Sequence, residues 1–459
     1  MSRNILIYAK ARTPRLEYLV DTLLGRFMGL EVHLTTDADH FRHHQNAKLA
    51  YATPLTRGHP LDEPGGVLVP ACELLFEEDI EPQYVRTTDW HGLPTLFPMD
   101  GDCMSVPFDL FAAAFYMLSC YEEYLPFEPD RHGRFSAEAS ALYENDFMER
   151  PLVDRWAREL EGLLSAHFPE LEIQQPAYQF LPTIDIDQAY AYMGKPLWRN
   201  AAGLLADILR LDTAAFGERL AVLVQAREDP YNTYRRLHYL AERAQAYPLY
   251  FLQVANHHAN DHALPLAHPL QQKVIHFLQQ QGYTLGLHPS YNCMAQPGLM
   301  NKEKHALEEV LDHEVNDVRM HFLRFRLPHT LREMIDCGFR RDYSLGYADG
   351  PGWRAGTCRS HCWFDLEANH TTSLERVPFY TMDRTMRHYT RWAPEDSIAP
   401  NLQAINEVRH LGGVFSFIWH NSSANRDSFT WKEWQTVLET LMQEGARTDT
   451  QLAPGPTPP

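Results

Sequence analysis

The sequence lacks several features that would mark whole classes of protein. No apolar run is long enough to span a bilayer, so we expect no integral membrane segment. Near the amino terminus, Lys10 and Arg12 interrupt the apolar residues before they reach the length of a secretory signal. Only seven cysteines are scattered over 459 residues, which predicts free thiols in a reducing compartment and a cytoplasmic protein. The one close pair, Cys358 and Cys362, has no second pair to complete a zinc site.

Basic residues are also scarce. Lysine and arginine together number 41 against 60 acidic residues, which gives a formal net charge of -19. This balance argues against a nucleic-acid or anionic-membrane surface, except where basic residues gather locally. The sequence contains no internal repeat, and it leaves the oligomeric state open.

The chain is long enough for two domains, and its pattern changes near Pro169. Residues 1–170 predict a smaller α/β domain, with strands and helices in mixed order. Its expected strands are 4–8 and 66–69, and its expected helices are 16–28, 107–118 and 153–167.

Residues 177–446 alternate between strand and helix patterns, which predicts parallel βαβ units and an α/β fold, a wound sheet or a barrel. The expected strands are 178–186, 249–254, 283–287, 321–325, 344–347 and 414–419. The expected helices are 269–280, 303–313, 330–337, 402–410 and 431–444, with an extra helical insertion over 197–245. The Pro- and Thr-rich tail, 447–459, is predicted to be disordered.

Residues that can carry chemistry follow three of the expected strands. Asp185 and Asp187 end the strand over 178–186, His288 follows the third strand and His420 follows the last. The carboxyl ends of the strands are where a (β/α) barrel builds its active site. One carboxylate can bind a metal ion, the other can accept a proton from water, and a histidine can protonate a leaving group. The pattern therefore predicts metal-assisted hydrolysis.

These segments, in this order, resemble the polysaccharide deacetylases with a NodB-homology domain (the carbohydrate esterase family 4 type). The resemblance spans roughly the last 280 residues, and the N-terminal third resembles an extra domain of a bacterial subgroup. It implies a distorted (β/α) barrel of the NodB type. The motifs that carry it are Thr183-Ile-Asp-Ile-Asp187, His288-Pro-Ser290, Arg319-Met-His-Phe322, Gly338-Phe-Arg-Arg-Asp-Tyr-Ser-Leu-Gly346 and Ile418-Trp-His420.

The resemblance also implies roles for single residues. Asp185 would be the catalytic base, Arg319 would orient it, and His420 would be the catalytic acid. Asp187 and His288 would bind one divalent ion, most simply zinc, and Asp383 would pair with His420. We group Asp383 with Tyr291 and Arg354 as residues around a glycan substrate.

The sequence departs from the family pattern in two places. The two aspartates are separated by Ile186, a spacing that keeps both on one face of a strand. Asn292 stands where the family's motif has a second histidine, and a neutral amide is a weaker zinc ligand than imidazole. We take Asn292 as the third metal ligand, with His321 and Asp261 as alternatives.

The predicted reaction is hydrolysis of N-acetyl groups on amino sugars of a glycan. Two alternatives stay open: a hydrolase of another linear amide, and a metal-free pseudoenzyme that binds glycans. The sequence does not identify the glycan.

Overall fold

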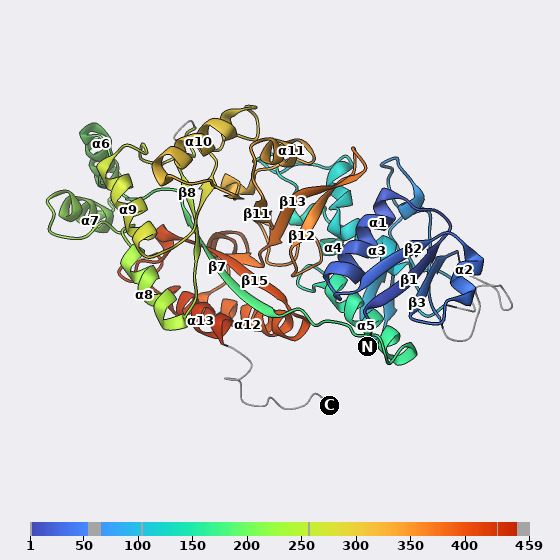
Figure 1. Cartoon of the computed structure of the whole chain (residues 1–459). Helices are drawn as coiled ribbons and strands as arrows, with labels where there is room; N and C mark the ends of the chain where they lie inside the picture. Colours follow the sequence, from blue (N-terminus) through green and yellow to red (C-terminus); the bar gives the residue numbers. More distant parts are fainter. Residues whose placement is uncertain (1, 54–65, 102–103, 256–257, 429, 448–459) are drawn as a thin grey trace.

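The computed structural model describes residues 2–53, 66–101, 104–255, 258–428 and 430–447. Two main sheets share no strand in these residues: one lies in the N-terminal part of the chain and the other in the C-terminal part (Figure 1). Apart from residue 447, the tail predicted to be disordered lies outside the described residues. Within the described part, no helix combines the length and apolar character needed to cross a membrane.

The N-terminal sheet has four parallel strands in the order β2-β1-β3-β4. Its first strand carries Ile5, Leu6 and Ile7, all buried, as expected for a central parallel strand covered on both faces. The strands are β1 (Asn4–Ala9), β2 (Glu31–Thr35), β3 (Lys48–Ala52) and β4 (Val67–Pro70), with a separate hairpin of β5 (Thr87–Trp90) and β6 (Leu93–Leu96). The helices are α1 (Pro14–Val20, continued as a π-helix to Arg26), α2 (Ala38–His43), α3 (Leu110–Leu118), α4 (Ala141–Glu144) and α5 (Leu152–His167).

The second sheet has nine strands in the order β12-β13-β11-β10-β9-β8-β7-β15-β14. Neighbours are parallel throughout, except for the antiparallel pair β12 and β13 at one edge. The strands are β7 (Tyr178–Ile186), β8 (Leu249–Gln253), β9 (Leu285–His288), β10 (Asp317–Val318), β11 (Arg341–Leu345), β12 (His361–Asp365), β13 (His370–Pro378), β14 (Thr381–Met382) and β15 (Gly413–His420). The sheet curls without closing, which confirms the prediction of a distorted (β/α) barrel.

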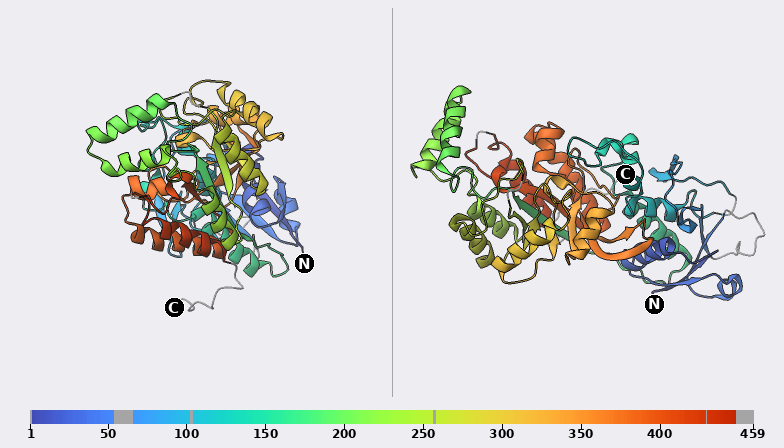
Figure 2. Two further views of the ribbon diagram at one scale, coloured as in Figure 1. Left: turned by 90° about the vertical axis from the view of Figure 1, so that its left-hand side faces the viewer. Right: turned by 90° about the horizontal axis from the view of Figure 1, so that it is seen from above.

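Helices follow most of the parallel strands, as a βαβ pattern requires. They are α6 (Leu197–Leu209), α7 (Thr213–Leu223), α8 (Tyr234–Ala244), α9 (Pro269–Gln280), α10 (Leu299–Leu311), α11 (His329–Asp336), α12 (Pro394–Leu411) and α13 (Gln435–Ala446). Most of them pack against the barrel, but α6 and α7 form a hairpin that projects from it (Figure 2).

Register brings the chemical residues to one end of the sheet. Asp185 on β7 is paired with His420 on β15, and Gln253 on β8 is paired with His288 on β9. Since all these strands are parallel, the side chains that end them lie at the same edge, as the sequence pattern predicted.

The predicted strand over 321–325 is wrong. After the two-residue strand β10, His321 to Leu323 form a 3₁₀ turn in which Phe322 and Leu323 have φ of 60° and 54°. This turn directs His321 toward the end of β7, which a continuing strand would not do. The antiparallel β12–β13 pair was not predicted, because β13 has a largely exposed, polar first half.

Candidate metal and catalytic site

Three side chains converge at the carboxyl end of the sheet. Asp187 follows β7, His288 ends β9 and His321 lies in the turn after β10, and their ligand atoms all lie within 4.8 Å of one another. The Nε2 atoms of His288 and His321 lie 3.2 and 3.7 Å from Asp187 Oδ1. That oxygen is buried and makes no hydrogen bond to any described residue. One carboxylate and two imidazoles that face each other in this way fit a divalent metal such as zinc.

Each histidine is held from behind by an oxygen acceptor. His288 Nδ1 lies 2.6 Å from the main-chain carbonyl of Arg319, and His321 Nδ1 lies 3.1 Å from Asp261 Oδ1. The carbonyl of Arg319 can only accept, so Nδ1 of His288 carries a proton. Nδ1 of His321 also lies 2.8 Å from the side-chain amide nitrogen of Gln253, and Nε2 of each ring faces Asp187. Gln253 donates to the same oxygen of Asp261 and keeps that carboxylate in place. Histidine ligands in metal sites are commonly oriented by such acceptors.

The structure favours one of the three alternatives for the third ligand. His321 belongs to the converging group, whereas Asp261 contacts the far nitrogen of the His321 ring. Asn292 lies in the turn after His288, where its main-chain carbonyl accepts from the amides of Ala295 and Gln296. Its role as a ligand stays a prediction.

The first aspartate has a different partner. Asp185 is buried, and its Oδ1 lies 3.2 Å from Arg319 Nη1, which is fully buried as well. The Arg319 guanidinium also donates to the carbonyl of Tyr343 at 3.2 Å and lies 4.6 Å above the ring of Phe251. Burial lowers the pKa of Arg319, and the charge of Asp185 opposes that effect. The other oxygen of Asp185 lies 3.8 Å from His288 Nε2, so this carboxylate borders the metal-ligating group.

His420 forms a second paired unit on the opposite side of Asp187. Its Nδ1 lies 2.7 Å from Asp383 Oδ1, and its main-chain amide donates to the other oxygen of Asp383. Its Nε2 points to Asp187 Oδ2 at 3.6 Å. Burial lowers the pKa of His420, but the charges of Asp383 and Asp187 outweigh burial and raise it to about 9. Burial raises the pKa of Asp383, and the charge of His420 more than offsets this and lowers it to about 2.

Asp187 stands at the centre of this arrangement. Burial tends to raise its pKa, but His420, His288 and His321 together hold the pKa well below its usual range. Three imidazoles surround this ionised carboxylate, each with an oxygen acceptor at its Nδ1, and the buried Arg319 lies nearby. Such a group of residues can hold a cation and move protons next to it.

Tyr291 lies at the rim of the site. Its ring stacks on His258 with centroids 4.4 Å apart, and the guanidinium of Arg324 lies 3.7 Å from its centroid. Its hydroxyl lies 2.9 Å from Nδ1 of His132, a residue of the N-terminal part of the chain. His258 and Arg324 both contact this ring, so the role of Tyr291 in substrate binding stays a prediction. No local sequence pattern marks its partner His132.

The segment Asp130–Arg134 as a whole is attached to the rim. Arg134 donates to the carbonyl of Phe322, next to His321, and Arg324 donates to the carbonyl of His132. The N-terminal part of the chain therefore supplies one side of the site.

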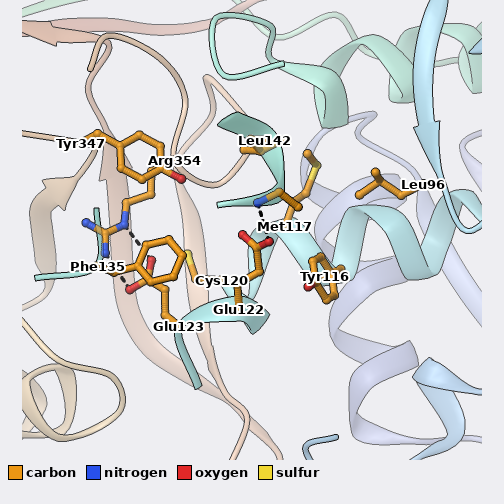
Figure 3. Close-up of a pocket in the computed structure, with 11 residues that line it drawn as sticks. Leu96, Tyr116, Met117, Cys120, Glu122, Glu123, Phe135, Leu142, Tyr347 and Arg354 are labelled. Carbon is orange, nitrogen blue, oxygen red and sulfur yellow. Dashed lines mark hydrogen bonds and ion pairs between the residues drawn. The ribbon is translucent and has the colours of Figure 1, made fainter. Parts of the chain in front are cut away.

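Arg354 is the predicted site residue that the structure places elsewhere. Its guanidinium donates to both carboxylate oxygens of Glu123 at 2.7 Å and to the carbonyl of Gly346 (Figure 3). The cavity beside this pair measures about 20 Å³, room for a water molecule and not for a sugar ring. Arg354 joins the N-terminal part to the barrel, and its placement does not support a substrate-binding role.

Known proteins resemble parts of this chain. A family of unknown function (DUF7033) matches residues 5–169. No curated protein matches the chain significantly. Two similar solved structures are presumed polysaccharide deacetylases. The one from Mycobacterium smegmatis has 13% identity and a TM-score of 0.39 over 60% of this chain and 86% of the other. The one from Pseudomonas aeruginosa has 12% identity and a TM-score of 0.37 over 60% of this chain and 85% of the other. A 4-alpha-glucanotransferase from Thermococcus litoralis has 10% identity and a TM-score of 0.35 over 60% of this chain and 38% of its own.

Proposed function

We propose that the chain is a metal-dependent hydrolase that removes N-acetyl groups from amino sugars of a glycan. One observation carries the proposal: a half-buried, ionised Asp187 lies between two separately paired units, Asp185 with Arg319 and His420 with Asp383. Metal-assisted amide hydrolysis uses a bound cation, a proton acceptor and a proton donor close together, and this arrangement offers ligands for the first and a residue for each of the others.

The cation would be held by Asp187, His288 and His321. These ligands suit zinc, which when bound would polarise the amide carbonyl and make a water molecule more acidic. The acceptors behind the two histidines, the carbonyl of Arg319 and the carboxylate of Asp261, support their Nε2 atoms as ligands.

Asp185 would be the proton acceptor. Arg319 lies 3.2 Å away and is itself buried, so its guanidinium fixes the orientation of the carboxylate. From the edge of the metal-ligating group, Asp185 can take the proton of the attacking water.

His420 would be the proton donor. Asp383 and Asp187 raise its pKa to about 9, which keeps the ring protonated near neutral pH. The proton on Nδ1 is held by Asp383, and the proton on Nε2 faces the site, where it can pass to the departing amine.

The two aspartates give the sharpest test of these roles. Asp185→Asn should abolish acetate release from an N-acetylated oligosaccharide and keep the metal, because only the proton acceptor is lost. Asp187→Asn should lower the metal content, since it removes a charged ligand. Asp365→Asn is a matched control, because Asp365 is equally buried and paired with Arg332 away from this site.

Acetate release and metal content, measured in parallel on all three proteins, distinguish the outcomes. If Asp185→Asn lost metal while Asp187→Asn stayed loaded and inactive, the two roles would be exchanged. If both variants released acetate like the parent, the site would not be the active site. A parent protein that binds glycans and takes up no metal would instead support the pseudoenzyme alternative.

A further inference from the structure

The hairpin of α6 and α7 has an unusual surface. Among the described residues, every large aliphatic or tryptophan side chain that is strongly exposed lies on it, and the other strongly exposed large hydrophobic residues are all tyrosines. The exposed residues are Leu197, Trp198, Leu205, Ile208, Leu209, Leu211, Leu220 and Val224. Three of them are more than three-quarters exposed: Leu197 at 87%, Leu211 at 85% and Leu209 at 76%. A patch of this kind on an otherwise ordinary surface marks an interaction site.

The buried face of α6 is polar, which is unusual for a helix of a soluble protein. The buried residues of α6 are Asn200 and Asp207. Asp207 accepts from Arg219 on α7 at 2.8 Å, and Gly203 leaves space for that arginine, since a Cβ there would lie 2.5 Å from it. An ion pair thus joins the two helices, Val222 is the buried residue of α7, and the side chains of the exposed patch face solvent.

The charges around the patch are of one sign along α6. Arg199 and Arg210 are exposed at its two ends, and its acidic residue, Asp207, is buried and paired. The guanidinium of Arg199 lies 5.4 Å from the ring of Trp198. An apolar stripe with a tryptophan and flanking arginines is the composition of helices that lie in the interface of an anionic membrane. The exposed arginines belong to α6, and the exposed Asp212 that begins α7 is acidic, in a chain with a net charge of -19.

The hairpin is also tied to the catalytic residues. The segment that leads into α6 begins directly after Asp187. Asp229, in the segment that follows α7, accepts hydrogen bonds from the amides of Ala191, Tyr192 and Met193 in the first segment. Asn421, next to His420, donates to the carbonyl of Gln188 before α6 and to the carbonyl of Tyr231 after α7. The base of the hairpin therefore lies beside the mouth of the site, and its tip projects away from the barrel (Figure 2).

We propose that the α6–α7 hairpin docks on an anionic membrane surface. The docking itself follows from the apolar stripe and its arginines. A second consequence rests on the proposed function: the glycan that reaches the site is carried at that surface by a lipid. The hairpin lies in the interface and does not span the bilayer.

Vesicle sedimentation tests the docking. The full-length protein should sediment with vesicles made of equal parts phosphatidylcholine and phosphatidylglycerol, and much less with phosphatidylcholine alone. The double variant Leu205→Glu, Leu209→Glu should lower the bound fraction by roughly tenfold, because it places two charges in the apolar stripe. Arg199→Glu should weaken binding to the anionic vesicles only, and salt should do the same.

Tyr247→Glu is the matched control. Tyr247 is 80% exposed and precedes β8, at the end of the sheet opposite the site, so a glutamate introduced there should leave binding intact. Metal content and helical circular dichroism should match the parent in every variant, since the substituted side chains point outward. A parent that fails to sediment with the anionic vesicles, or a hairpin variant that sediments like the parent, overturns the docking. A parent that elutes as a dimer, which Leu205→Glu, Leu209→Glu converts to a monomer, assigns the patch to a second copy of the chain and overturns it as well.

Acetate release from two substrates distinguishes a failure of the docking from a failure of the proposed function. Acetate release should fall by about tenfold in the hairpin variant when the N-acetylated glycan is carried by a lipid in anionic vesicles, and should not change for a soluble oligosaccharide. If the hairpin variant lost equal activity on both substrates, the lipid-carried substrate would be excluded. If the parent sedimented with vesicles and released acetate from neither substrate, the docking would stand and the proposed function would fail.

Discussion

Each of the two sheets has an aspartate at the carboxyl ends of its strands, fully buried in one and half-buried in the other, and the two are used differently. In the four-stranded sheet, Asp109 lies at the carboxyl ends of β3 and β4. Its oxygens accept from the amide of Ala112, the amide of Cys72 and the hydroxyl of Tyr51, all between 2.7 and 2.8 Å. In the nine-stranded sheet, Asp187 occupies the corresponding edge, and its Oδ1 accepts no hydrogen bond from the described residues.

The difference shows that burial of a charged residue does not by itself indicate function. Asp109 closes a structural network in which each oxygen is satisfied by the chain itself, and it begins α3 as an N-cap. Asp187 faces three imidazoles and is not hydrogen-bonded at the oxygen that two of them share. A buried charge with an unsatisfied atom and converging ligands is the feature that identifies a site.

The largest expected effect is the loss of metal and activity when a metal ligand near Asp187 is replaced. His288→Ala and His321→Ala should each remove most of the bound metal and with it acetate release, because a lost imidazole cannot be replaced locally. Asn292→Ala should keep the metal. Elemental analysis of the purified proteins decides the matter, and metal lost from Asn292→Ala but retained by His321→Ala would make Asn292 the third ligand.

A smaller loss is expected at the proton donor. His420→Ala should retain the metal and lower kcat by roughly a hundredfold, the usual contribution of general acid catalysis. Substrates with a better leaving group should be affected less, because they need less help from a proton donor. Equal losses for good and poor leaving groups would remove His420 from this role.

Asp383→Asn should shift the pH dependence of the reaction. The charge of Asp383 raises the pKa of His420, so its removal lowers that pKa and deprotonates the ring at a lower pH. The alkaline limb of the kcat profile should therefore move toward lower pH, with a loss of about tenfold at the parent's optimum. A profile that falls in height and keeps the position of its alkaline limb would contradict this coupling.

The smallest effect on activity is expected for Asp109→Asn in the other sheet. An amide cannot accept all the donors around this position, so the free energy of unfolding should fall by about 1–2 kcal/mol near neutral pH, with metal content and kcat unchanged. Urea denaturation followed by circular dichroism measures the difference. Metal loss from this variant would contradict the purely structural role of Asp109.

The free energy of unfolding of this variant, relative to the parent, should change with pH in a defined direction. Burial raises the pKa of Asp109 from 3.8 to about 6, so its folded form prefers the proton more than its unfolded form does. Between these values the folded state binds more protons, and stability contributed by Asp109 is present at low pH and is lost as pH rises through about 6. The variant should lack this loss, and its stability relative to the parent should therefore improve as pH rises across the window.

Much of the barrel could be predicted because its strands and helices are encoded locally. The expected strand over 178–186 and helix over 269–280 have the bounds of β7 and α9, and the strand over 414–419 lies within β15. Parallel strands then place their carboxyl ends at one edge by topology alone, which is why Asp185, Asp187, His288 and His420 were found together.

The rest of the site depends on turns and on contacts between distant segments. His321 reaches the site through a turn with positive φ at Phe322, where a strand was expected, so it could be predicted only as an alternative ligand. The contact of His132 with Tyr291 spans 159 residues, and no local pattern encodes it. Arg354 lies in a glycine-rich segment that suggested a loop at the site, and its partner Glu123 could not be known from spacing.

The segment Asp130–Arg134 has a consequence for how such a protein evolves. It belongs to the part of the chain that matches a family of unknown function, and it contacts Tyr291 and Phe322 beside the site of the barrel. A recombination event that exchanged either part alone would leave these contacts unmatched. Selection on the reaction is therefore selection on both parts, and the two should be inherited as one gene with matched changes on either side of this contact.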